Sequence, residues 1–198
     1  KKRFGIWKDT GLMLKGSGVQ SLTALFLEMW DFTTGSVSNP KDYAPTLRYT
    51  ARGFVQSYGD SPLDEENVAE NAYFNVLQQA TNYVYIATPY LVVDNEMITT
   101  LTLIAKSGVD VRIITPGIPD KWYVYWVTQS YYRVLLEAGV RIFEYTPGFI
   151  HAKMYPACRK RFLYTLKELL NKCVGFFFSH NKNIRGILNF ILDRKSTR

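Results

Sequence analysis

The chain is poor in cysteine and histidine and contains no long hydrophobic run. Its two cysteines, Cys158 and Cys173, are too few for the disulfide framework of a small secreted domain. A metal site would have to combine them with the two histidines, His151 and His180, and none of the four is paired at the spacing of a zinc motif. The apolar runs are far shorter than the roughly 18 residues of a membrane span. We therefore expect no disulfide scaffold, no metal and no transmembrane helix in these residues.

Positive charge is concentrated towards the C-terminal end. Residues 1–155 contain 14 Lys and Arg against 15 Asp and Glu, a net charge of −1, whereas residues 156–198 contain 10 against 2, a net charge of +8. With 47% hydrophobic and 21% charged residues, the composition is that of a globular protein and excludes extensive disorder. The abrupt change at residue 156 predicts a boundary between a body and a basic tail, which we expect to pack poorly.

Helical and extended patterns alternate along the body. Apolar residues at helical spacing predict helices around residues 19–30 and 68–77, the second with an N-cap at Ser61. From residue 83 the pattern becomes strand 83–87, helix 94–107, strand 109–114, helix 122–138 and strand 140–145, and Gly108 and Gly139 follow the two helices. Strands joined by helices of this length predict an α/β fold with a mainly parallel sheet and helices on both faces.

The predicted sheet brings several polar loops to one edge. Ligands of parallel sheets bind at the carboxyl ends of the strands, where the loops contain Tyr90, Gly117 and Tyr145. His151 and Lys153 follow, and two residues of a strand at this spacing point to the same side. An imidazole can attack phosphorus or protonate a leaving alkoxide, and a lysine can neutralise charge on phosphoryl oxygens. The pair therefore indicates phosphoryl-transfer chemistry.

Two other sites compete with this interpretation. Cys158 could act as a nucleophile beside His151, although no neighbouring residue in the sequence would activate the thiol. Gly16 and Gly18 precede a predicted helix and could cradle a phosphate. Two glycines without a third are more typical of an ordinary turn that leads into a helix. We therefore prefer the pair of His151 and Lys153.

Several strings within residues 83–155 resemble the second half of a bacterial cardiolipin synthase of the phospholipase D superfamily: ATPYLVVDNEM, SGVDVRIITPGIPD, YWVTQSYYRVLLEAGVRIFEY and GFIHAKMY. The string WKDTGLMLKGSGVQSLTALFLEMW is similar to the segment after that family's first catalytic motif. The resemblance, over about residues 1–155, implies an α/β/α sandwich of two pseudo-equivalent halves, each with an H-x-K-x4-D motif. It also implies that one histidine forms a phosphatidyl-histidine intermediate, that the other protonates the leaving alcohol, and that no metal or organic cofactor takes part.

The resemblance assigns roles to individual residues. His151 and Lys153 match the catalytic histidine and lysine of the second motif, and we expect Tyr90 to bind substrate. We assign structural roles, in turns or as a helix cap, to the other matching loop residues, namely Pro89, Asp94, Pro116, Gly117, Pro119 and Asp120.

The chain departs from the family pattern at three places. Cys158 occupies the position of the motif's acid, and the stretch with Ser and Asn that should follow is absent from residues 156–198. The first H-x-K is absent too, and since the chain begins at Lys1 without a methionine, we expect that an upstream region is missing. We expect residues 1–50 to be the trailing part of a first half, residues 51–155 an incomplete second half, and residues 156–198 a tail foreign to the family, as a frameshift would produce.

The leading hypothesis is a truncated and inactive fragment of a phosphatidyltransferase that transfers a phosphatidyl group between two phosphatidylglycerol molecules. Its expected partners are an anionic phospholipid and a membrane surface, its expected location is the bacterial cell membrane, and no nucleic-acid partner is expected. Two alternatives stay open. One is a one-motif phosphodiesterase or nuclease that acts as a homodimer. The other is a non-catalytic module whose basic tail binds anionic lipid or nucleic acid.

Overall fold

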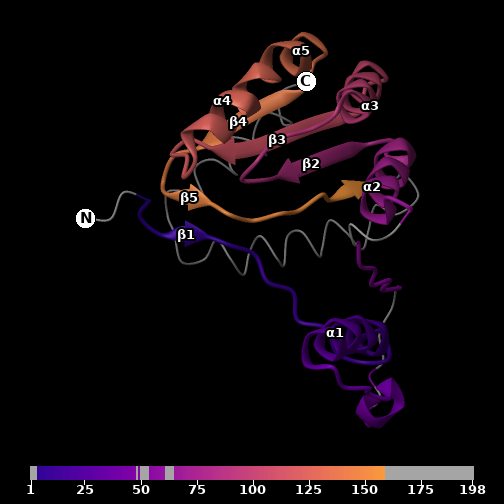
Figure 1. Ribbon diagram of the computed structural model, residues 1–198. Helices are drawn as coiled ribbons and strands as arrows, with labels where there is room; N and C mark the ends of the chain where they lie inside the picture. The colour runs from indigo at the N-terminus through magenta and orange to yellow at the C-terminus, as the bar shows by residue number, and fades with distance from the viewer. Residues whose placement is uncertain (1–3, 48, 50–53, 61–64, 159–198) are drawn as a thin grey trace. The chain divides into compact units, whose positions relative to one another are not determined.

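The computed structural model describes residues 4–47, 49, 54–60 and 65–158 (Figure 1). The described residues form two compact units, one from residues 4–10 with 76–158 and the other from the described residues between 11 and 75. The pair predicted as catalytic lies in the first unit. Ser61, Cys173, His180 and the tail from residue 159 lie outside the described residues.

The first unit is built on a four-stranded sheet. Its spatial order is β4 (Arg141–Tyr145), β3 (Asp110–Pro116), β2 (Tyr83–Ala87) and β6 (Ala157–Cys158). β3 pairs in parallel with both β2 and β4, whereas β6 pairs with β2 in the antiparallel direction. A second, two-stranded parallel sheet joins β1 (Trp7–Lys8) to β5 (Phe149–Ile150). The predicted α/β fold with a mainly parallel sheet is thus confirmed.

In the described part of this unit, helices cover one face of the sheet. α3 (Asn95–Lys106) connects β2 to β3, and α4 (Trp122–Ser130) with α5 (Tyr132–Glu137) connects β3 to β4. The strands β2, β3 and β4 follow one another in a single direction, so right-handed crossovers place both connections on the same face, as Figure 1 shows. A helix that connects two parallel strands would lie on the opposite face only if its crossover ran in the reverse direction along the sheet. The expected sandwich with helices on both faces is therefore not confirmed for the described residues.

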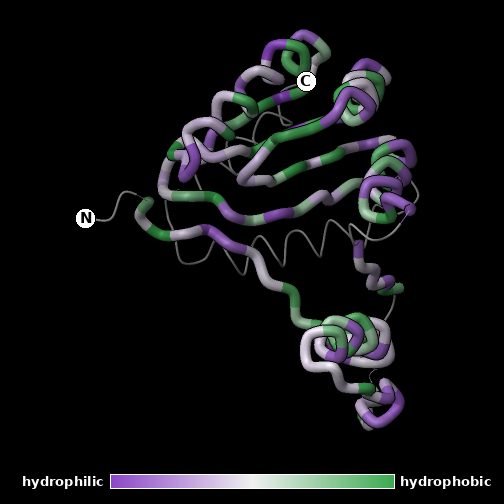
Figure 2. The backbone as a smooth tube through the Cα atoms, in the orientation of Figure 1, coloured by the Kyte–Doolittle hydropathy of each residue, from purple (hydrophilic) through white to green (hydrophobic). Residues whose placement is uncertain are grey.

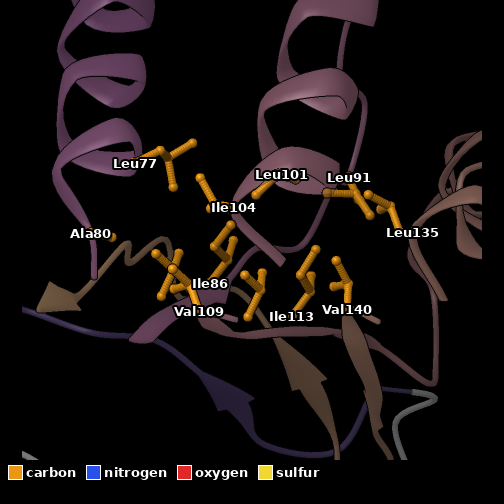
Figure 3. Packing of buried hydrophobic residues seen from close by; sticks show 12 residues of the cluster. Leu77, Ala80, Ile86, Leu91, Leu101, Ile104, Val109, Ile113, Leu135 and Val140 are labelled. Carbon is orange, nitrogen blue, oxygen red and sulfur yellow. The ribbon is translucent and has the colours of Figure 1, made fainter. Parts of the chain in front are cut away.

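A hydrophobic core fills the space between these helices and the sheet. Successive side chains of a strand face opposite sides, so every second residue of β2 and β3 points towards the helices. The strands carry marked hydrophobic stretches (Figure 2), and Figure 3 shows the side chains of α2 (Val68–Gln79), α3 and α5 packed above them. The most buried members of this cluster are Leu77, Val84, Ile86, Leu91, Leu101, Val111, Ile113, Leu135 and Val140.

Replacing Leu101 by alanine should lower the free energy of unfolding by about 3 kcal/mol, because a truncated core leucine leaves a cavity. Leu101 is 1% exposed, whereas Leu103 in the same helix is 61% exposed. Leu103→Ala is therefore a matched control and should change the free energy by less than about 0.5 kcal/mol. Urea unfolding followed by circular dichroism measures both values. Equal losses in the two variants would contradict this packing of α3.

Local signals predicted the ends of α3 well and the course of the next helix less well. The carboxylate of Asp94 caps α3 by accepting a backbone hydrogen bond at 2.7 Å, and Gly108 and Gly139 adopt φ values of +91° and +93°. The predicted helix 122–138 is divided at Tyr131, whose backbone N–H donates to the carbonyl of Thr128, three residues back. This tight turn replaces the usual bond to the fourth residue back and separates α4 from α5.

The sheet continues beyond the boundary drawn from charge. The backbone N–H of Tyr85 donates to the carbonyl of Pro156 at 2.9 Å, and Cys158 lies opposite Tyr83 with 3% of its surface exposed. Residues 156–158 carry no charge. The charge pattern therefore could not show that the sheet includes them.

The face of the sheet away from the core holds a polar cluster. The guanidinium of Arg112 donates to the carboxylate of Asp110 at 2.7 Å and lies 4.9 Å from the ring centroid of Tyr85. Arg141 on β4 also pairs with Asp110, and the hydroxyl of Tyr85 donates to the same carboxylate at 3.2 Å. These partners compensate for the burial of Arg112, which is only 6% exposed.

The second unit contains α1 (Val19–Thr34), the short 3-10 helix η1 (Pro40–Tyr43) and the first part of α2. α1 ends at Thr34 and is capped by Gly35, which has a φ of +69°. α2 begins at Val68, after three non-helical residues at 65–67. Between η1 and α2, the described residues at 47, 49 and 54–57 form no strand.

Candidate active site

The structure brings the side chains of His151 and Lys153 together. The Nζ atom of Lys153 lies 2.9 Å from Nε2 of His151 and 2.9 Å from that residue's backbone oxygen. Both residues lie between β5 and a bridge that pairs Met154 with Ala87, the last residue of β2. The segment that carries the pair therefore runs beside the carboxyl end of β2, the end at which ligands of such sheets bind.

Asp9, which the sequence did not single out, is the second partner of His151. Its Oδ2 atom lies 3.0 Å from Nδ1 of the imidazole, although the two residues are 142 positions apart. β1 and β5 bring them together, with Trp7 opposite Phe149, and the backbone N–H of His151 donates to the carbonyl of Lys8 at 2.8 Å. The string WKDTG contains this carboxylate, but only the pairing of the two strands identifies its partner.

The two partners assign the protonation of the imidazole. A charged lysine side chain only donates hydrogen bonds, so Nε2 of His151 accepts from Lys153. Nδ1 then carries the proton and donates it to Asp9. The hydrogen bond from His151, with a further one from the backbone of Thr10, holds the pKa of Asp9 below its ordinary value. The site thus places Nε2 of His151 beside the ammonium of Lys153 and Nδ1 beside the carboxylate of Asp9.

Aromatic rings hold the imidazole in place. The ring centroids of Trp7 and Phe149 lie 5.2 Å and 6.1 Å from that of His151, and 4.7 Å from each other. Phe149 is fully buried, whereas the side chain of His151 is 31% exposed. The imidazole is therefore packed on one side and accessible to a ligand on the other.

Gly148 allows β1 to approach β5 closely. A Cβ atom at this position would overlap the backbone oxygen of Ile6 and lie 3.2 Å from that of Phe4. Backbone atoms cannot move aside as the end of a flexible side chain can. The glycine is thus required for the strand pairing that places Asp9 against His151.

Gly148→Ala should loosen β1 from β5 and so separate Asp9 from His151. The amides of Phe149 and His151, which donate to the carbonyls of Phe4 and Lys8, should then exchange with solvent at least about tenfold faster. Hydrogen exchange measured by NMR tests this. Gly11→Ala is the control, because a Cβ there would meet nothing within 4 Å. Unchanged exchange in the Gly148 variant would show that the close approach is not needed.

Tyr90 follows β2, and its hydroxyl is bonded to Asp120 in the loop after β3. The hydroxyl donates to Oδ2 of Asp120 at 2.6 Å, and Oδ1 accepts from the backbone N–H of Lys121 at 2.8 Å. The hydrogen bond to Asp120 raises the pKa of Tyr90 to about 12. Asp120 was expected only as part of a solvated turn. Its carboxylate instead joins the loops that follow β2 and β3. Because Tyr90 and Asp120 are 30 positions apart, no local sequence pattern predicts this contact.

Two further contacts hold the loops at this edge. The hydroxyl of Thr128 accepts from the backbone N–H of Leu91 at 3.1 Å and donates to its carbonyl at 3.3 Å. The backbone N–H of Gly117 donates to the carbonyl of Tyr145 at 2.9 Å, and a Cβ at Gly117 would lie 3.0 Å from the same oxygen. The structural role expected of Gly117 is thus observed.

The competing sites are less suitable for catalysis. The turn with Gly16 and Gly18 leads into α1, and the N–H groups of Val19 and Gln20 donate to carbonyls three residues back. Those donors are therefore not directed at a phosphate. Cys158 is buried in β6. Within the described ranges, no group of three or more His, Cys, Asp or Glu side chains could hold a metal ion.

A parallel α/β sheet with a His–Lys pair beside its carboxyl edge agrees with the phospholipase D-like class. Residues 73–166 match the family model described as cardiolipin synthase, PLD-like domain, so the chain contains a domain of this class. The resemblance to cardiolipin synthases is confirmed. The match also includes the first residues beyond position 155.

The similarity to individual proteins covers more of the chain than the family model does. An uncharacterized protein of Streptococcus mutans is 51% identical over 163 residues, which is 79% of this chain and 34% of the relative. A cardiolipin synthase of a Geobacillus species and cardiolipin synthase 2 of Bacillus cereus are 40% and 37% identical over 155 residues, which is 77% of this chain and 31% and 30% of theirs. The chain thus spans about a third of the length of these relatives. No solved structure matches it.

In the part of the chain that the structure describes, no helix combines the length and the apolar character that crossing a bilayer requires.

Proposed function

We propose that residues 1–155 supply the second catalytic motif of a cardiolipin synthase-like phosphatidyltransferase. The observation that carries this proposal is the set of contacts made by His151. Nδ1 is bound to a carboxylate, and Nε2 presents its lone pair next to the ammonium of Lys153. A nucleophile oriented by a third group in this way is typical of covalent catalysis. The relatives named cardiolipin synthase support phosphatidylglycerol as the substrate.

In the proposed reaction, Nε2 of His151 attacks the phosphorus atom of phosphatidylglycerol. A nitrogen–phosphorus bond forms, and the bond from phosphorus to the glycerol oxygen breaks. Glycerol leaves with a proton from a second histidine, which the first half of the intact enzyme supplies. A hydroxyl of a second phosphatidylglycerol then attacks the phosphatidyl-histidine, returns a proton to the second histidine and releases cardiolipin. Lys153 stabilises the negative charge on the phosphoryl oxygens in both steps.

We further propose that the chain is inactive by itself. Half of the paired site lies outside it, and the proximity of paired groups contributes several orders of magnitude to such reactions. Cys158 also replaces the acid of the motif, and its thiol is buried in β6. A buried thiol cannot supply the charge of a carboxylate. The location that fits this function is the cell membrane, where the lipid substrate resides.

A chimera tests the proposed function directly. The segment of the Geobacillus cardiolipin synthase that matches this chain is replaced by the corresponding residues of this chain, and the rest of the relative supplies the other half of the site. The chimera should form cardiolipin from phosphatidylglycerol, as measured by thin-layer chromatography, whereas the isolated chain should stay at background. A folded but inactive chimera would contradict the assignment of the site. Cardiolipin formation by the isolated chain at enzymatic rates would contradict its inactivity.

A further inference from the structure

The imidazole of His151 lies between an aromatic pair and a cation. Phe149 precedes His151 by two residues, and Lys153 follows it by two. Trp7 lies opposite Phe149 in the pairing of β1 with β5, and the centroids of these two rings are 4.7 Å apart. Along the segment that carries the site, the two rings therefore come before the imidazole and the ammonium comes after it.

Trp7 is the member of the aromatic pair that a ligand can reach. It is 50% exposed, whereas Phe149 is fully buried. The centroid of its ring lies 6.4 Å from that of Phe4 and 5.2 Å from that of His151, so the indole is held by rings on more than one side. A large, fixed aromatic ring offers apolar contact area at a low cost in conformational entropy. Trp7 thus provides an apolar surface next to the proposed nucleophile.

The charges around the imidazole decide where the parts of a phosphatidyl group can lie. The unesterified phosphoryl oxygens are negative and are attracted to the ammonium of Lys153, 2.9 Å from Nε2. The carboxylate of Asp9, 3.0 Å from Nδ1, repels them. The third oxygen of the phosphatidyl group carries diacylglycerol, whose acyl chains favour apolar surroundings. Of the rings that contact the imidazole in the described residues, Trp7 is the exposed one.

We propose that Trp7 receives the diacylglycerol part of the phosphatidyl group while Lys153 holds the phosphoryl oxygens. This orientation of the substrate rests on the proposed function. In an in-line displacement the leaving oxygen lies opposite the attacking atom, so the departing glycerol points away from Nε2 of His151. The chain then contacts the group that it retains in the covalent intermediate, and Trp7 is a specificity-determining residue for the acyl part of the donor.

Fluorescence of the full chain tests this orientation without turnover. The chain has four tryptophans, and Trp30→Phe/Trp122→Phe/Trp126→Phe leaves only Trp7. The three replaced rings are 53%, 59% and 64% exposed, so phenylalanine should be tolerated at each position. A short-chain phosphatidylglycerol with brominated acyl chains, kept below its micelle concentration, should quench Trp7. Adding Lys153→Ala should weaken the apparent affinity at least about tenfold, because a charge-assisted contact with phosphate is lost.

A second variant with a single tryptophan is the matched control. Trp7→Phe/Trp30→Phe/Trp122→Phe leaves Trp126, and the same lipid should not quench it. Excess glycerophosphoglycerol, which has the phosphate without acyl chains, should restore the fluorescence of Trp7 because it competes for Lys153. Three results would each overturn the orientation: no quenching of Trp7, equal quenching of Trp7 and Trp126, or quenching of Trp7 that Lys153→Ala leaves unchanged.

Kinetics of the chimera separate substrate binding by Trp7 from support of the imidazole. Trp7→Ser should raise KM for short-chain phosphatidylglycerol at least about tenfold with kcat within about threefold, because an acyl contact is present in the ground state and the transition state alike. Trp7→Phe should restore most of the affinity, and Trp126→Ala should leave both constants within about twofold. A fall in kcat with an unchanged KM would show that Trp7 only positions His151 and would overturn the orientation.

The orientation and the proposed function fail in different ways. The quenching experiment keeps Trp7 in place, so its result does not depend on how well Trp7→Ser folds. Quenching of Trp7 that depends on Lys153, together with an inactive chimera, would overturn only the transfer function. An active chimera whose KM is insensitive to Trp7→Ser, together with a full chain in which Trp7 is not quenched, would overturn only the orientation.

Discussion

Replacing His151 by alanine in the chimera should abolish cardiolipin formation, with turnover reduced by at least about 10⁴-fold. The alanine removes the only atom proposed to bond to phosphorus, so no covalent intermediate can form. Denaturation in detergent at neutral pH after a single turnover with labelled phosphatidylglycerol should recover labelled protein from the chimera and none from the variant, because the nitrogen–phosphorus bond is hydrolysed in acid. Met154→Ala is a suitable control, because its side chain is 38% exposed and is given no catalytic role.

Residual turnover above about one per cent in the His151 variant would contradict a nucleophilic role. Labelled protein in that variant would identify another attacking group. Loss of turnover in both His151→Ala and Met154→Ala would indicate that the segment between β5 and β6 had lost its structure. Circular dichroism of both variants distinguishes this loss of structure from loss of the nucleophile.

Lys153→Ala should lower kcat/KM of the chimera by about 10²-fold, equivalent to about 3 kcal/mol of transition-state stabilisation. The ammonium lies 2.9 Å from Nε2 of His151, so a phosphoryl group attacked by that nitrogen would lie within reach of the same charge. Steady-state kinetics should show that most of the loss is in kcat, because the charge on the phosphoryl oxygens grows towards the transition state.

Lys106→Ala, at the exposed end of α3, is the matched control for lost positive charge and should leave kcat/KM within about twofold. Equal losses in the two lysine variants would attribute the effect to net charge alone. An increase in KM with an unchanged kcat would show that Lys153 binds the ground state and the transition state equally.

The sequence by itself determined the elements whose signals are local. Alternating apolar residues identify the strands at 83–87 and 140–145, Asp94 and Gly108 delimit α3, and the spacing of His151 and Lys153 places their side chains together. In each case the physical cause acts within a few residues, through the pleat of a strand, a capping hydrogen bond or a left-handed glycine. A single sequence contains that information.

Only the tertiary structure decided which distant residues meet. Asp9 reaches His151 because β1 pairs with β5 and Gly148 admits the backbone of Ile6, and Tyr90 meets Asp120 because β2 and β3 are neighbours. The helices of the first unit cover one face because its strand order proceeds in one direction. Register, strand order and close backbone approach depend on pairs of segments rather than on either segment alone. No periodicity or cap within one segment specifies which other segment it pairs with, so the sequence alone could not predict these contacts.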